Sequence, residues 1–160
     1  GQSVAGFDPR AMRGNGVTFA TSPMGADHTA GNVVGLCLQG RLDPMDAERA
    51  VEVSRNLQID TAAFDSTGLC FMASVALKDP QPGEVFRKAI NAILGTQFGP
   101  DDFPRAMGIR VLKAEREFNR KAGFTNEDDR LPRFYYEEPL PPHNTVFVIS
   151  DEELDRTFDF

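Results

Sequence analysis

Residues 102–123 read DFPRAMGIRVLKAEREFNRKAG, and this stretch decides the class of fold. Its apolar residues recur every three or four positions, at Met107, Val111, Ala114, Phe118 and Ala122. Such spacing places them on one face of an α-helix, with arginine and lysine side chains away from that face. Asp-Phe-Pro at the start and Gly123 at the end are typical start and stop signals. We therefore predict an amphipathic helix here.

Two earlier segments carry comparable helix signals. Apolar residues recur with helical spacing over 86–94, and Gly95 follows as a stop signal. Asp43 before Pro44 has the pattern of an N-cap and a first helical position, and a face of small residues continues to residue 57. We predict one helix with Pro82 near its start and Gly95 just after its end, and another that begins at Pro44.

Two further helices are predicted from weaker patterns. Between Asp65 and Leu77 the apolar residues suit a helix with Asp65 at its N-cap position. A helix between residues 9 and 21 contains Gly14 and Gly16, and each glycine costs about 1 kcal/mol relative to alanine. That helix therefore needs tertiary support.

The chain changes in character after residue 124. Pro132, Pro139, Pro141 and Pro142 exclude regular helix, so we expect an extended surface segment. Residues 145–149 have strand-like content, and Ser150 with Glu153 forms the capping-box pattern of a short terminal helix. We predict an all-α fold, a multihelical array over 1–124, followed by an extended Pro-rich tail with a short terminal helix over 125–160.

The composition excludes several classes of function. The 160 residues carry a net charge of -7, with no basic cluster that would bind nucleic acid or an anionic membrane. No apolar run approaches the ~20 residues that cross a bilayer. Cys37 and Cys70 cannot form a disulfide framework for a chain of this size, which predicts a reducing, cytoplasmic location. The chain has neither an initiating Met nor a leader pattern, and we expect it to be a piece of a longer protein.

One short segment combines residues that suit cofactor chemistry: Asp65-Ser66-Thr67-Gly68-Leu69-Cys70. A helix N-terminus offers free N–H groups and positive potential, which favours a thiolate. Gly68 would let the backbone approach a flat ligand. The alternative is structural: Asp65 as a plain N-cap, Gly68 for packing, and Cys70 as a small buried hydrophobe.

The remaining reactive side chains form no recognisable motif. The two cysteines and two histidines lack the spacing of a structural zinc site. We expect Cys37 in the core, His143 in solvent, and Arg10 in a salt bridge with Asp8 or another carboxylate. His28 has the alternative of a hydrogen-bonded histidine in a helical turn.

Several stretches in order resemble the C-terminal helical region of the tungstopterin aldehyde ferredoxin oxidoreductases. The D-x-x-G-L-C motif at 65–70 looks like that family's second pterin and cluster motif. Upstream, FDPR at 7–10, G-x-G at 14–16 and ATSPMGADH at 20–28 are similar to further family stretches. Downstream, the similar stretches are EREFN at 115–119, GF at 123–124, DDRLP at 128–132, RF at 133–134 and EPL at 138–140.

The resemblance implies a role for individual residues. Cys70 would be the last of four thiolate ligands to a four-iron four-sulfur cluster. Asp65 would hydrogen-bond the pterin, with Gly68 and the Leu69 backbone beside it. His28 would lie beside tungsten, or molybdenum in some relatives, and donate a hydrogen bond or relay a proton.

The resemblance also implies an activity: oxidation of an aldehyde to a carboxylic acid, with ferredoxin as the electron acceptor. The other cluster ligands and an N-terminal pterin-binding domain would lie upstream, so we expect the isolated fragment to hold no cofactor and to be inactive. An exposed apolar face would mark where the missing domain docks and would favour self-association, including a possible homo-oligomer. The alternative is a stand-alone helical interaction module without redox chemistry.

Overall fold

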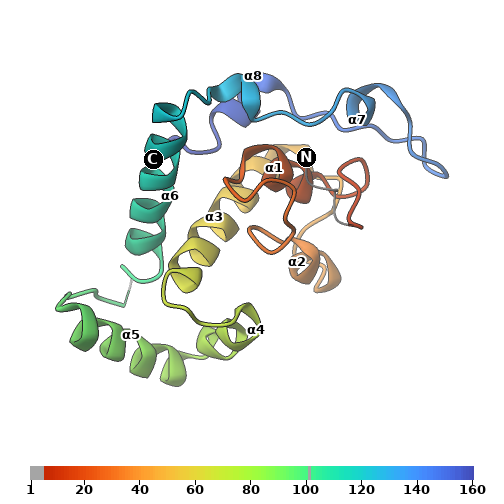
Figure 1. Cartoon of the computed structure of the whole chain (residues 1–160). Helices are drawn as coiled ribbons and strands as arrows, with labels where there is room; N and C mark the ends of the chain where they lie inside the picture. Colours follow the sequence, from red (N-terminus) through yellow and green to blue (C-terminus); the bar gives the residue numbers. More distant parts are fainter. Residues whose placement is uncertain (1–5, 101) are drawn as a thin grey trace. The chain divides into compact units, whose positions relative to one another are not determined.

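The structure is a computed structural model that describes residues 6–100 and 102–160, and it is built from helices (Figure 1). The α-helices are α1 (Arg13–Thr21), α2 (Val34–Leu38), α3 (Ala47–Asp65), α4 (Phe71–Ser74), α5 (Pro80–Leu94), α6 (Arg105–Lys121), α7 (Phe134–Glu137) and α8 (Asp151–Asp155). Two 3₁₀ helices, η1 (Val75–Lys78) and η2 (Asn126–Asp128), join them. Within the described ranges, β-pairing is limited to a single bridge between Leu140 and Thr145. The prediction of an all-α fold is confirmed.

The chain forms two compact units. Unit 1 runs from the N-terminus to Gln58 and resumes over Glu115–Phe160, whereas unit 2 is Ile59–Ala114. The long helices α3 and α6 each begin in one unit and end in the other. Among the described residues, no helix is both long and apolar enough to cross a membrane.

Helix α1 lies at the centre of unit 1 and is buried from Gly14 to its end. A Cβ added at Gly14 would lie 2.6 Å from Val33 Cγ1, and one added at Gly16 would collide with the ring of Phe147. Both glycines are therefore needed for close packing, and tertiary contacts outweigh their low helix propensity. The predicted dependence of this helix on tertiary support is confirmed.

The core of unit 1 draws on residues far apart in sequence. Val17 and Phe19 of α1 cluster with three side chains from the last third of the chain, Phe147, Ile149 and Leu154, each at most 2% exposed. A buried polar layer lies beside this core, where the Thr18 and Ser54 hydroxyl oxygens are 2.7 Å apart and Gln58 Nε2 donates to Thr21 Oγ1 at 3.1 Å. The predicted division of the chain at residue 124 stays a prediction.

Arg10 attaches the N-terminal segment of unit 1 to the C-terminal segment. Its guanidinium pairs with Asp8 at 2.7 Å and donates through Nη1 to the Glu138 carbonyl at 2.8 Å. Its Cζ lies 5.4 Å from the centre of the Tyr135 ring. The predicted salt bridge with Asp8 is confirmed, and the Arg10 guanidinium holds the pKa of Asp8 below its ordinary value.

Two of the predicted helix boundaries are wrong. Helix α3 begins at Ala47 instead of Pro44, because the Asp43 carboxylate accepts from Met45 N–H at 2.8 Å and shapes a turn. Asp46 then acts as the cap and accepts from Arg49 N–H at 3.0 Å. Helix α3 also continues to Asp65, so Asp65 ends a helix and is not the N-cap of the next one.

Helices α5 and α6 confirm the two clearest patterns, with Gly95 at φ 64° and Gly123 at φ 99° after their last turns. The apolar stripe of α6 is nevertheless not its buried face. Gly108 and Leu112 are buried in α6, whereas Phe118 is 72% exposed. The capping box predicted at Ser150 is confirmed, since its hydroxyl accepts from Glu153 N–H at 3.3 Å.

Candidate functional site

The segment at 65–70 forms a hydrogen-bonded turn that leaves α3 and enters α4. Gly68 N–H donates to the Asp65 carbonyl at 3.0 Å, and Thr67 Oγ1 donates to the Phe64 carbonyl at 2.6 Å. Gly68 has φ 72°, in the left-handed region that favours glycine. The turn therefore has a defined backbone shape that depends on glycine at this position.

Cys70 lies at the far end of this turn, as the N-cap residue of α4. Its carbonyl accepts from Ala73 N–H at 2.9 Å, and its thiol is free on an exposed residue. The alternative of a buried, hydrophobic Cys70 is therefore wrong. A Cβ added at Gly68 would meet nothing within 4 Å, so the face of the turn beside Gly68 is open. Asp65 is also exposed, at the last position of α3.

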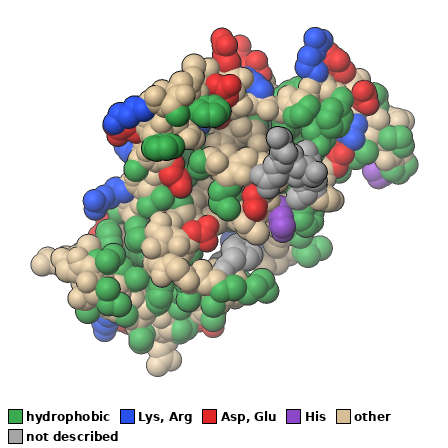
Figure 2. Space-filling model, in the orientation of Figure 1, with side chains coloured by type: hydrophobic (Ala, Val, Ile, Leu, Met, Phe, Trp, Pro, Cys, Tyr) green, Lys and Arg blue, Asp and Glu red, His purple; other side chains and the backbone are tan. Residues whose placement is uncertain are grey.

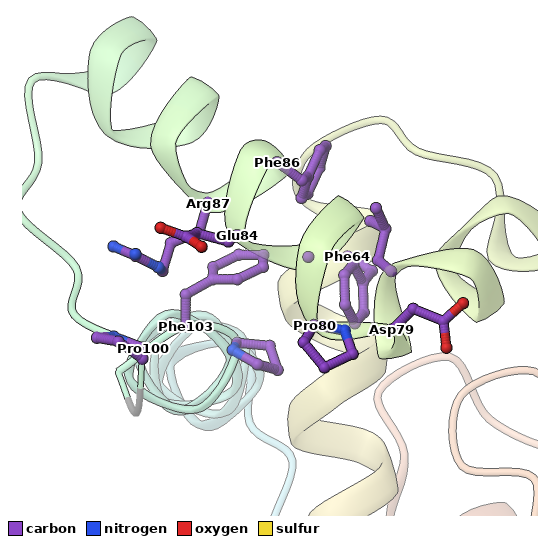
Figure 3. Close-up of a pocket in the computed structure, with 11 residues that line it drawn as sticks. Phe64, Asp79, Pro80, Glu84, Phe86, Arg87, Pro100 and Phe103 are labelled. Atoms are coloured by element: carbon purple, nitrogen blue, oxygen red, sulfur yellow. The ribbon is translucent and has the colours of Figure 1, made fainter.

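A cavity of about 190 Å³ lies in the same unit, and Phe64, the residue before Asp65, lines it. Its wall is an aromatic cluster in which the Phe64 and Phe103 rings meet edge to face at 5.6 Å and the Phe86 and Phe103 centroids are 5.9 Å apart. Figure 3 shows Phe64, Pro80 and Phe103 gathered beside α5, with Arg87 on one side and Asp79 on the other. Sequence reasoning missed this cavity, because its aromatic residues are spread over forty positions and no single helix pattern links them.

His28 belongs to unit 1, whereas the turn at 65–70 belongs to unit 2. The His28 side chain is half-buried in a turn, and its ring centre lies 5.4 Å from that of Phe7. The preceding Asp27 accepts from both the N–H and the hydroxyl of Thr29 at 2.6 Å. These hydrogen bonds lower the pKa of Asp27, so a carboxylate is fixed next to His28 along the chain.

Unit 1 also brings together four of the stretches quoted in the sequence analysis. The ends of α1 and α6 and the segment around η2 line a cavity of about 270 Å³, which includes Ser22, Asn119 and Arg130. At its edge, Arg116 pairs with Asp129 at 2.5 Å and lies over the ring of Phe158. The EREFN and DDRLP stretches therefore serve, at least in part, to join α6 to the following segment.

The two remaining candidates behave as single surface or semi-buried residues. Cys37 is half-buried in α2, and burial raises the pKa of its thiol. His143 is exposed, as expected. Within residues 6–100 and 102–160, no three His, Cys, Asp or Glu side chains converge as a metal site would need. Cys70 can therefore supply only part of a ligand set.

Hydrophobic side chains also gather on the surface of unit 2. In α5 the exposed fractions of Val85, Ile93 and Leu94 are 65%, 78% and 55%. Figure 2 shows the hydrophobic colour concentrated over this part of the chain. The expectation of an exposed apolar face where a missing domain docks stays a prediction.

Comparison with known proteins gives a consistent result. The family model described as aldehyde ferredoxin oxidoreductase, domains 2 and 3, matches residues 1–159. The protein named tungsten-containing aldehyde ferredoxin oxidoreductase in Pyrococcus furiosus is 34% identical to this chain over 95% of the chain's length. The protein of the same name in Pyrococcus horikoshii is 32% identical to it over 98%. A protein of the same name in Thermococcus kodakarensis is 32% identical over 95% of this chain. The chain spans 26% of the length of each of these relatives.

Proposed function

Because this chain belongs to the aldehyde ferredoxin oxidoreductase family and matches its domains 2 and 3, we propose that it is the C-terminal part of an enzyme that oxidises aldehydes to carboxylic acids. Ferredoxin is the proposed electron acceptor, and an N-terminal pterin-binding domain of the same protein is the proposed partner of this chain. The names of these relatives support tungsten as the metal.

The turn at 65–70 is the observation that carries the proposal. An exposed Cys70 thiol and an open face at Gly68 fit one side of a site for a flat pterin and a neighbouring cluster. When bound, the tungsten pterin supplies the two-electron oxidation and the four-iron four-sulfur cluster carries electrons away one at a time. Cys70 is the proposed cluster ligand, and Asp65, Gly68 and Leu69 are the proposed pterin contacts.

The number of cysteine thiols in this chain also supports the proposal that the isolated fragment is inactive. Four thiolates usually hold such a cluster, and this sequence has two cysteines. Cys37 is a poor candidate for a second ligand, because burial raises the pKa of its thiol and disfavours the thiolate. Three ligands would therefore come from outside this chain.

His28 is the proposed proton-handling residue. An imidazole titrates closer to neutral pH than other side chains, so it can donate a hydrogen bond to a substrate oxygen or accept a proton from it. Phe7 packs against the ring and limits its orientations.

The test compares Cys70→Ser with Cys37→Ser in the complete protein. We expect Cys70→Ser to lose iron or to change the cluster's electron paramagnetic resonance signal, whereas Cys37→Ser keeps both. Unchanged iron content and an unchanged signal in Cys70→Ser would rule out the ligand assignment. Aldehyde oxidation with a viologen acceptor by the isolated 160 residues would contradict the proposed inactivity of the fragment.

A further inference from the structure

The cavity of unit 2 is smaller than most ligand pockets, but its lining suits a small molecule. Its volume is about 190 Å³, and apolar side chains of Phe64, Leu77, Phe86 and Phe103 contribute to its wall. An engineered apolar cavity of about 150 Å³ binds benzene. The cavity here can therefore hold one aromatic ring with a short substituent.

The aromatic wall favours a ring as the apolar part of the ligand. Phe64 and Phe103 already meet edge to face, and the Phe98 and Phe103 centroids are 6.3 Å apart. Aromatic pairs in such geometry are stabilised beyond the burial of their area. An aryl group would extend this cluster, whereas an alkyl chain would gain only the burial.

The charged groups at the cavity differ in how firmly they are held. Arg87 is half-buried, and its Nη1 donates to the Phe98 carbonyl at 2.7 Å, which fixes the guanidinium. Asp79 and Glu84 are exposed, and Glu84 is paired with Lys88 at 2.8 Å. Water and salt screen exposed carboxylates more than a half-buried guanidinium. Lys88 and then Arg87, which lies beside Glu84 (Figure 3), lower the pKa of that exposed carboxyl, and the remaining N–H donors of Arg87 suit a carboxylate or carbonyl oxygen on the ligand.

We propose that this cavity binds a small ligand with one aromatic ring and a carboxylate or carbonyl group, with the ring against Phe64 and Phe103 and the oxygens toward Arg87. The inference stands on the cavity alone, and it does not require the redox activity proposed above. Neither Asp65 nor Cys70 takes part in it.

The first experiment measures binding to the 160-residue chain by ligand-observed NMR and calorimetry. Three probes share one aryl group and differ in charge: phenylacetate, benzyl alcohol and benzylammonium, with acetate as the probe without a ring. We expect phenylacetate to bind more tightly than benzyl alcohol, benzylammonium to bind most weakly of the three, and acetate not to bind. Acetate binding equal to that of phenylacetate, or a preference for benzylammonium, would overturn the proposal.

Two variants and a control assign the site. Leu77→Phe fills the cavity, so both phenylacetate and benzyl alcohol should lose at least tenfold in affinity. Arg87→Met should weaken phenylacetate by about tenfold or more, since a hydrogen bond to a charged group contributes roughly 1.5–3 kcal/mol, and should leave benzyl alcohol within twofold. Retained benzyl alcohol binding also shows that this variant is folded. Arg110→Met, at an exposed position of α6, should change nothing, and equal loss in Arg110→Met and Arg87→Met would exclude a role for Arg87.

The assay contains no cofactor, so its outcome is separate from that of the iron measurement on the complete protein. Aryl binding together with an unchanged cluster in Cys70→Ser would support the ligand site in the cavity and refute Cys70 as a cluster ligand. A lost cluster signal in Cys70→Ser without aryl binding would support Cys70 as a cluster ligand and refute the ligand site in the cavity.

Discussion

Replacing Gly14 by alanine has two opposite effects on the free energy of unfolding. Alanine in a helix interior is favoured over glycine by about 1 kcal/mol. At Gly14, however, the new Cβ would lie 2.6 Å from Val33 Cγ1 and 3.3 Å from Val33 Cγ2. Forcing an extra carbon into a packed core costs about 1–3 kcal/mol, and Val33 is fully buried, so it has no solvent side to move into. The difference between these two effects predicts a net loss of up to about 2 kcal/mol in the free energy of unfolding.

The prediction is checked by urea unfolding of the chain, followed by circular dichroism. Gly35→Ala is the matched control, because a Cβ there meets nothing within 4 Å, and we expect it to be neutral or stabilising. Val33→Ala should rescue Gly14→Ala in a double-mutant cycle, with a coupling free energy of about 1–2 kcal/mol, since it removes the two clashing carbons. Equal or greater stability of Gly14→Ala relative to the native chain, with no coupling to Val33, would refute the packing argument.

Three other measurements follow from the structure. Asp8→Asn should lower the free energy of unfolding by roughly 1 kcal/mol at pH 7, because Asp8 forms a partly buried pair with Arg10. The folded-state pKa of Asp8 lies below its ordinary value of 3.8, so this stabilisation is present above that pH and is lost as the pH falls through the folded pKa. An equal difference in the free energy of unfolding between the native chain and Asp8→Asn at pH 7 and at pH 2.5 would contradict this reasoning. In a thiol-reactive dye assay at pH 8, Cys37→Ser should keep the fast phase and Cys70→Ser should lose it, because Cys70 is exposed and burial raises the pKa of Cys37. Ile93→Glu should reduce self-association in analytical ultracentrifugation, because Ile93 is 78% exposed on the apolar surface of α5, and an unchanged sedimentation profile would show that this surface does not drive association.

The sequence predicted helices well where one signal had no competitor. Gly95 and Gly123 were predicted as stop signals because each follows a clear apolar stripe. In the structure each adopts positive φ just after the last turn of α5 or α6. The start of α3 was wrong because two aspartates compete as caps, and only the three-dimensional turn after Asp43 decides in favour of Asp46. Local patterns cannot resolve such a choice.

Long-range features were beyond local sequence reasoning. Phe64, Phe86 and Phe103 look unrelated along the chain, and folding of unit 2 is what gathers them around one cavity. The candidate residues at 65–70 were found from a motif, but the exposure of Cys70 and the open face at Gly68 needed the structure. The buried face of α6 was missed for the same reason, because burial depends on what packs against a helix.

The placement of unit 2 between the two segments of unit 1 has a consequence for synthesis on the ribosome. Val17 and Phe19 are made well before their core neighbours Phe147, Ile149 and Leu154. Loop-closure entropy grows slowly with length, so the insertion costs little stability, but contacts of such long range form late. The segment before unit 2 therefore lacks these core contacts until residues 147–154 have been made, whereas the uninterrupted Ile59–Ala114 segment needs no later residues for its own contacts.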